Sequence, residues 1–180
     1  QNDYLLFTGR INDERKNIPL LLTAFATVKD KYPDLKLVLI GEQPNKKLAK
    51  LIDKLDLKHS LKILGRLAQI EELLPYYQHA ALFIVPSFQE GLCISALEAL
   101  ACGIPIISTR CGGTEDFVRD GDNGFLVKIN DPEELSKKII EFLDLGDDRK
   151  KELGRHARDY IDSHYSPENA WRKLLECFDL

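Results

Sequence analysis

Glu90 and Glu98 are two carboxylates whose spacing suggests a shared ligand. They lie eight positions apart in the segment 87–99, shortly after an apolar run. With Glu90 in a loop and Glu98 in a helix, a rise of about 1.5 Å per residue puts their backbones up to about 12 Å apart. The carboxylate pair of retaining glycosidases is closer, at about 5 Å. The wider spacing favours one long polyhydroxylated ligand with a carboxylate at each end. The alternatives are a solvated loop acid at Glu90 and an exposed helix stripe at Glu98.

Basic residues follow the first apolar run of the chain. Gly9 and Arg10 come directly after residues 4–8, and Arg15 and Lys16 precede a predicted helix. Glycine lets a ligand approach the backbone, and cations beside a helix N-terminus favour a diphosphate. The chain contains neither GxGxxG nor GxxxxGK[ST], so it has no dinucleotide fingerprint and no P-loop. A solvated basic loop is the alternative interpretation.

A third candidate for ligand contact is the pair Gly112 and Gly113. The pair follows an apolar run that begins near Pro105 and precedes a segment interpreted as a helix. Glycines between a strand and a helix are typical of a ligand-facing turn. A tight strand-to-helix turn that meets no ligand explains the pattern equally well.

Short apolar runs alternate with helical patterns along the whole chain. Near-continuous apolar runs are typical of strands covered on both faces of a parallel sheet. Asn17 is predicted to cap a helix over residues 17–31, Asp131 to cap another, and Ser166 to start a last helix through Trp171 and Leu175. The alternation predicts an α/β fold with a doubly wound, mostly parallel six-stranded sheet, helices on both faces and ligands beyond the carboxyl ends of the strands. The predicted strands are Tyr4–Thr8, Leu35–Ile40, Leu61–Leu64, Ala81–Val85, Pro105–Ser108 and Gly124–Val127.

Size and composition indicate a single domain over residues 1–180. The 180 residues are 44% hydrophobic and carry a net charge of −4, which argues against a general nucleic-acid binder. The longest apolar run, Ala80–Val85, is far shorter than the ~20 residues of a membrane helix. The four cysteines lack metal-ligand spacing and look like reduced thiols, so we expect no metal and a cytoplasmic location. Because the chain starts at Gln1 and contains no Met, we expect a fragment of a longer protein.

Lysines at a spacing of four residues form one face of a predicted helix and continue past it. Leu48, Leu51, Ile52 and Leu55 form the opposite, apolar face of that helix. We interpret the lysines as a solvated face, and contact with an anionic membrane surface or an acidic partner is the alternative. The series comprises Lys46, Lys50, Lys54, Lys58 and Lys62, with Lys47 beside it.

Taken together, these motifs resemble the donor-binding, C-terminal half of a GT-B glycosyltransferase of family 4, also called group 1. Each motif is weak alone, but their order and spacing are specific, and the resemblance covers residues 4–143 with a compatible helical tail. It implies a Rossmann-like domain that forms one half of a GT-B fold. The motifs are Gly9-Arg10 with Lys16 six residues later, Glu90 and Glu98 with seven residues between them, Gly103-x-Pro105, Gly112-Gly113 and Asn123-Gly124.

The resemblance also implies roles for individual residues. Arg10 and Lys16 would hold the diphosphate leaving group, Glu90 the donor sugar and Glu98 the ribose hydroxyls. Backbone amides at Leu92, Cys93 and Ile94, after Gly91, would meet a phosphate or sugar oxygen. The base would lie near the backbone of Gly65-Arg66-Leu67, and Gly9 would let the ligand approach. The implied activity is sugar transfer from a nucleoside-diphosphate sugar with retained configuration, in which Arg10, Lys16 and Glu90 are the catalytic residues and no cofactor takes part.

Two departures from the family pattern bear on these expectations. Leu92 and Cys93 stand where the family commonly has Phe-Gly, and Asp116 stands where it often has Glu. The acceptor-binding domain that precedes this half in the family is absent from the sequence, so we expect donor binding without sugar transfer. Contact of the full enzyme with the cytoplasmic face of a membrane stays open. The alternative functions are a non-catalytic nucleotide-sugar-binding subunit or regulatory module and, less favoured, a GT-B sugar-nucleotide epimerase.

Overall fold

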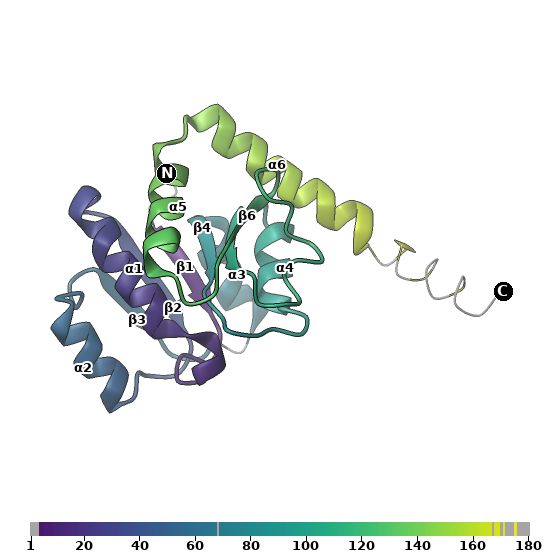
Figure 1. Ribbon diagram of the computed structural model, residues 1–180. Coiled ribbons are helices and arrows are strands. Elements are labelled where there is room, and N and C mark those ends of the chain that lie inside the picture. The colour runs from purple at the N-terminus through teal and green to yellow at the C-terminus, as the bar shows by residue number, and fades with distance from the viewer. Residues whose placement is uncertain (1–3, 68, 167, 170, 172–174, 176–180) are drawn as a thin grey trace.

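Six parallel strands form one sheet in the order β3-β2-β1-β4-β5-β6 (Figure 1). The computed structural model describes residues 4–67, 69–166, 168–169, 171 and 175. Every strand begins and ends within one residue of its predicted bounds, and the order is that of a doubly wound α/β fold, as the sequence predicts. The strands are β1 (Tyr4–Thr8), β2 (Lys36–Ile40), β3 (Leu61–Leu64), β4 (Ala80–Val85), β5 (Ile106–Thr109) and β6 (Gly124–Val127).

Helices cover both faces of the sheet and bury a separate apolar cluster on each. The alternation of side chains along a strand explains the two clusters, since Leu5 and Phe7 of β1 belong to one and Leu6 to the other. One face carries α1 (Ile18–Lys31), α2 (Lys46–Lys54) and α5 (Pro132–Asp144). The other carries α3 (Ile70–Gln78) and α4 (Ile94–Ala101), while α6 (Asp147–His164) contributes Leu153 to the first cluster and Ala157 to the second.

The start of α1 differs from its prediction in one detail. The helix does follow Asn17, but the Asn17 side chain makes no capping hydrogen bond. Asn17 ends a short 3₁₀ helix, η1 (Glu14–Lys16), in a left-handed conformation with φ 47°. Pro19, at the second helical position, has no N–H for a cap to accept. Asp131 does cap α5, as predicted, by accepting from the Glu134 amide at 2.8 Å.

The segment after Gly113 forms a series of turns, so the predicted helix there is wrong. The chain makes a single helical turn, closed by the bond from the Val118 amide to the Thr114 carbonyl at 2.8 Å. Asn123 then ties the loop back on itself by accepting from the Arg119 amide at 2.7 Å. Only about ten residues separate Gly113 from the start of β6, too few for a helix and a return to the sheet.

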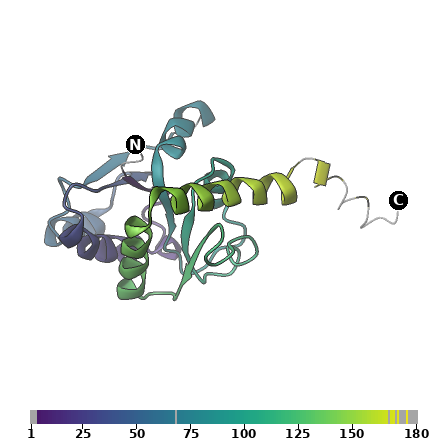
Figure 2. The same cartoon turned by 90° about the horizontal axis from the view of Figure 1, so that it is seen from above.

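Two helices have no counterpart among the predicted elements. They are α3, which contains Pro75, and α6, whose buried residues are Leu153 and Ala157 alone. Figure 2 shows α6, in yellow-green, running crosswise to α5 and out toward the C-terminus. The predicted last helix from Ser166 lies largely outside the described residues.

The described residues also bear on membrane span and on the cysteines. No helix among them is both long enough and apolar enough to cross a membrane. Cys93, Cys102 and Cys111 are free thiols. Cys177 lies outside the described part of the chain.

Candidate functional site

Apart from Arg66, which follows β3, the predicted site residues follow the two central strands. Neighbouring β1 and β4 are the point in the sheet where the strand order reverses, and in such sheets ligands bind beyond the carboxyl ends of the strands at this point. Arg10 and Lys16 follow β1, while Glu90 and Glu98 follow β4. The topology therefore gathers residues from two distant parts of the sequence at one edge.

Lys16 and Glu90 form an ion pair at this edge. Lys16 Nζ lies 2.7 Å from Glu90 Oε1, and the two side chains are only 18% and 10% exposed. The Ser87 hydroxyl donates to the same oxygen at 2.5 Å. Both donors bind Oε1, which leaves Oε2 without a donor among the described residues. Glu90 is therefore held by the protein on one oxygen, which is not the arrangement of a solvated loop acid.

Arg10 and Arg15 share Asp13 as their partner. Asp13 Oδ2 lies 2.8 Å from Arg10 Nη2 and 2.9 Å from Arg15 Nη2. The hydrogen bond from Arg15 lowers the pKa of Asp13 from 3.8 to about 2. Sequence reasoning did not single out Asp13, although its position between the two arginines is the signal that points to it. A cavity of about 190 Å³ brings the cations together and is lined by Arg10, Arg15, Lys16, Gln89, Glu90 and Gly91.

Backbone contacts fix the loop that carries Glu90. The Phe88 amide donates to the Arg15 carbonyl at 2.7 Å, which joins this loop to η1. On the other side, the Glu90 amide donates to Cys111 O at 2.8 Å and the Gly113 amide to Glu90 O at 3.0 Å. A Cβ on Gly113 would lie 1.3 Å from Gly91 O, so only glycine fits here. The glycine pair thus supports the Glu90 loop through its backbone.

Glu98 is held by a tyrosine of α3. Its Oε2 accepts from the Tyr77 hydroxyl at 2.7 Å, and the Thr8 hydroxyl lies 2.9 Å from the same Tyr77 oxygen. Tyr77 lies in the last turn of α3 and is 1% exposed. Burial raises the pKa of its phenol. The sequence carries no motif that points to Tyr77. These contacts distinguish Glu98 from an exposed helix stripe.

The N-terminus of α4 lies between the two glutamates in the sequence. Its first residue is Ile94, and the N-cap Cys93 makes no side-chain capping bond. The first backbone hydrogen bonds at this end run from the amides of Ala96 and Leu97 to Cys93 O. The amides before Ala96 are therefore those that a helix leaves without partners. Leu92 and Ile94 are exposed, whereas Cys93 is buried, which raises the pKa of its thiol.

A second cavity, of about 410 Å³, adjoins the first through Arg10. Gly9 lines it with φ +145°, a conformation that favours glycine. The Glu42 carboxylate accepts from the Asn12 amide at 2.9 Å through Oε1, and its buried Oε2 has no hydrogen-bond partner among the described residues. Arg66 Nη2 is 3.9 Å from Oε2. The lining residues are Thr8, Gly9, Arg10, Ile40, Gly41, Glu42, Arg66, Leu67 and Leu73.

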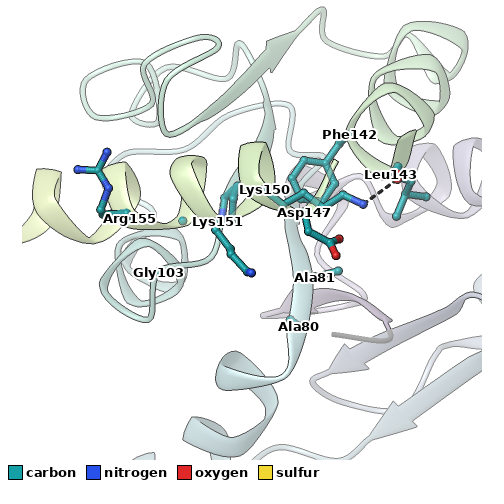
Figure 3. Close-up of a pocket in the computed structure, with 11 residues that line it drawn as sticks. Ala80, Ala81, Gly103, Phe142, Leu143, Asp147, Lys150, Lys151 and Arg155 are labelled. Atoms are coloured by element: carbon teal, nitrogen blue, oxygen red, sulfur yellow. Dashed lines mark hydrogen bonds between the residues drawn. The ribbon is translucent and has the colours of Figure 1, made fainter. Parts of the chain in front are cut away.

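A larger cavity lies at the opposite edge of the sheet. It measures about 690 Å³ and is bounded by the start of β4, the end of α5 and the first turns of α6 (Figure 3). Lys150 there donates to the Leu143 carbonyl at 2.7 Å. Gly103 and Pro105 of the predicted Gly103-x-Pro105 motif line this cavity, but none of the residues predicted to contact the ligand does. Size alone therefore does not identify the functional site of this fold.

Comparison with known proteins finds similar sequences and similar solved structures. An uncharacterized glycosyltransferase of Methanocaldococcus jannaschii is 31% identical over 171 residues, which are 94% of this chain and 45% of that protein. The solved structure of a point mutant of S. aureus TarM, in complex with fondaparinux, alpha-GlcNAc-glycerol and UDP, has a TM-score of 0.86 at 26% identity. The match covers 99% of this chain and 36% of the TarM chain. The C-terminal domain of a group 1 glycosyl transferase from Francisella tularensis has a TM-score of 0.80 at 23% identity and covers 92% of this chain and 86% of its own.

The lengths and the family model complete the comparison. The chain spans less than half the length of the Methanocaldococcus relative. The model described as glycosyl transferases group 1 matches residues 1–160, which are most of the chain. With Arg10, Lys16, Glu90 and Glu98 following the central strands of a doubly wound sheet, and with the family model matching most of its length, the chain belongs to the group 1 family of glycosyl transferases.

Proposed function

We propose that this chain is the donor-binding, C-terminal half of a retaining GT-B glycosyltransferase of family 4. It binds a nucleoside-diphosphate sugar and uses no metal or other cofactor. The observation that carries the proposal is the 2.7 Å pairing of Lys16 with Glu90 in the cavity that Arg10 also lines. A cation suited to a diphosphate and a carboxylate suited to sugar hydroxyls thus meet in one cavity.

In this proposal Arg10 and Lys16 hold the diphosphate. Negative charge develops on that group as it leaves the sugar, and cations held nearby stabilise it. The amides of Leu92, Cys93 and Ile94 add donors at the start of α4, where a helix favours an anion. Lys16 is held by Glu90 on one side only, so its remaining N–H groups are available to phosphate oxygens.

The two glutamates divide the rest of the ligand between them. Glu98, inside α4, accepts hydrogen bonds from the ribose hydroxyls. Glu90 accepts from the donor sugar through Oε2, since Oε1 already binds Lys16 and Ser87. The base lies in the cavity of about 410 Å³ beside Arg66. UDP is the nucleotide in the TarM structure, which makes uracil the first base to test.

The complete enzyme in this proposal has a further, acceptor-binding domain before this one. The support is the length of the Methanocaldococcus relative, of which this chain covers 45%. The three free cysteines among the described residues support a cytoplasmic location, because thiols stay reduced there.

Calorimetric titration with UDP, GDP, ADP and their glucose conjugates tests the proposal. We expect the wild-type chain to bind one base family and to prefer the sugar conjugate. Glu98→Ala should weaken the diphosphate and its conjugate by the same factor, roughly tenfold or more for a charge-assisted contact. Glu90→Ala should remove the preference for the conjugate without weakening the diphosphate, because Lys16 keeps its charge when its partner is removed.

Two results contradict the proposal. If the chain binds none of these ligands, the proposed donor site is wrong. If Glu90→Ala lowers the affinity for the diphosphate and for the conjugate equally, the proposed division of roles between the glutamates is wrong. A thermal melt of each variant shows whether it is folded, and Glu98→Ala should fold because Ala favours a helix.

A further inference from the structure

Tyr77 connects β1 to Glu98 through two hydrogen bonds. Its hydroxyl lies 2.7 Å from Glu98 Oε2 and 2.9 Å from Thr8 Oγ1. The three residues come from α3, α4 and the end of β1, so the contact spans three elements. Tyr77 is 1% exposed, and its ring lies 5.9 Å from that of Phe83 in the sheet.

The chemistry of the three groups fixes the direction of both bonds. An ionised carboxylate only accepts hydrogen bonds, so the Tyr77 hydroxyl must donate its single proton to Glu98. The phenol oxygen can then only accept from Thr8, whose hydroxyl proton therefore points at Tyr77. Burial raises the pKa of Tyr77, which keeps the phenol protonated and able to donate.

We propose that Tyr77 is a positioning residue that fixes the Glu98 carboxylate through Oε2 and so presents Oε1 to the hydroxyls of the ligand. The inference rests on the proposed function, in which Glu98 binds the ribose. Because the Tyr77 ring is buried and cannot move with a mobile side chain, its hydroxyl holds one oxygen of Glu98 at a defined point. The carboxylate is then oriented before the ligand arrives, and less rotamer freedom is lost on binding.

The test compares each nucleotide with its 2′,3′-dideoxy form. UDP, GDP and ADP and their dideoxy forms are titrated into the wild-type chain, and the pair that binds is carried forward. Tyr77→Phe removes only the hydroxyl oxygen. We expect it to weaken the ribonucleotide by roughly three- to tenfold, the size of one lost hydrogen bond, and the dideoxy nucleotide by less than about twofold.

Tyr4→Phe is the matched control. The Tyr4 hydroxyl also joins β1 to α3, by donating to the Tyr76 carbonyl at 2.8 Å, but it does not contact Glu98. A purely structural role of the tyrosine hydroxyls would give the two variants the same effect on binding. We expect Tyr4→Phe to leave both nucleotides at wild-type affinity, and thermal melts show how much stability each variant loses.

The outcomes separate this inference from the proposed function. If the wild-type chain binds no nucleotide, or if Glu98→Ala weakens the ribonucleotide and the dideoxy form equally, the ribose role of Glu98 fails and the inference falls with it. If Glu98→Ala is selective for the ribonucleotide while Tyr77→Phe affects both forms equally or neither, the inference alone is overturned.

Discussion

Lys16 and Glu90 lie 74 positions apart in the sequence and 2.7 Å apart in the structure, where Nζ meets Oε1. The ion pair links the segment after β1 to the segment after β4. Because the side chains are mostly buried, their attraction is screened less than that of a surface pair. Each residue therefore holds the other in place, and a change in one alters the charge that the other presents to a ligand.

Lys16→Ala should weaken a nucleoside diphosphate far more than the matching nucleoside. Loss of a charge-assisted contact costs about 1.5–3 kcal/mol, or roughly ten- to a hundredfold in affinity. The substitution also leaves the Glu90 carboxylate without its cation, which repels an anionic ligand further. Calorimetric titration at low and high salt measures the effect, and we expect the loss to shrink as salt screens the charges.

Lys54→Ala provides the matched control for this experiment. Lys54 is exposed at the end of α2, which leads into the amino end of β3 and so away from the site. The variant loses the same charge, yet we expect wild-type affinity for both ligands. An equal loss of nucleoside and diphosphate affinity in Lys16→Ala would contradict the diphosphate role of Lys16.

Asp13→Asn should remove a pH-dependent part of the free energy of unfolding. The pKa of Asp13 is lowered from 3.8 to about 2 in the folded chain, chiefly by its hydrogen bond to Arg15. A lowered pKa stabilises the fold at pH values above about 4, and this contribution disappears as the pH falls toward 2. Asp13 also caps η1 by accepting from the Arg15 backbone amide at 3.0 Å, and Asn keeps that oxygen but not the charge. Urea unfolding should therefore separate the two proteins at pH 6 and bring them together near pH 2; a constant difference would contradict the ion-pair origin.

The strands and the two glutamates could be predicted because their signals are local. Apolar runs such as Ala80–Val85 indicate the strands, and strand ends in a parallel sheet indicate the edge at which Lys16 and Glu90 meet. The predicted cap at Asn17 was wrong. Asn17 adopts a left-handed conformation, and Pro19, two residues later, has no N–H to donate to its side chain. Its neighbours still started the helix at the expected residue.

The partners of the site residues could not be predicted because they depend on packing between distant elements. Pro75 argues against a helix over α3, since proline removes a donor inside it, so the element that carries Tyr77 was missed. With α3 missing, nothing in the sequence indicates that Tyr77 meets Glu98. The highly charged α6 likewise buries too few side chains for an apolar pattern to indicate it.

We expect the 180-residue chain to bind its donor without transferring sugar to an acceptor. The chain covers 45% of its Methanocaldococcus relative, and the proposed donor residues occupy one edge of one sheet. Water needs no acceptor site, so slow hydrolysis of the sugar nucleotide is compatible with the proposal. Release of nucleoside diphosphate is followed with and without sugar acceptors, and the anomers are assigned by NMR. Robust transfer with retained configuration by this chain would refute the expectation.

Gly113→Ala should displace the Glu90 loop and remove the preference for the sugar conjugate. An added Cβ would lie 1.3 Å from Gly91 O and 3.3 Å from Glu90 O, so the backbone that carries Glu90 must move. Overpacking of this kind costs about 1–3 kcal/mol of unfolding free energy. We expect calorimetry to show a loss of sugar-conjugate affinity that exceeds any loss of diphosphate affinity.

Gly146→Ala separates this displacement from the general effect of adding a methyl group. Gly146 precedes α6 with φ −64°, and a Cβ there meets no atom within 4 Å. Alanine is a poorer N-cap than glycine, so the variant should lose at most about 1 kcal/mol of stability, with ligand preference unchanged. If Gly113→Ala keeps the wild-type preference for the sugar conjugate, the contact between Gly113 and Gly91 does not position Glu90. The stability loss would then reflect strain in the turn alone.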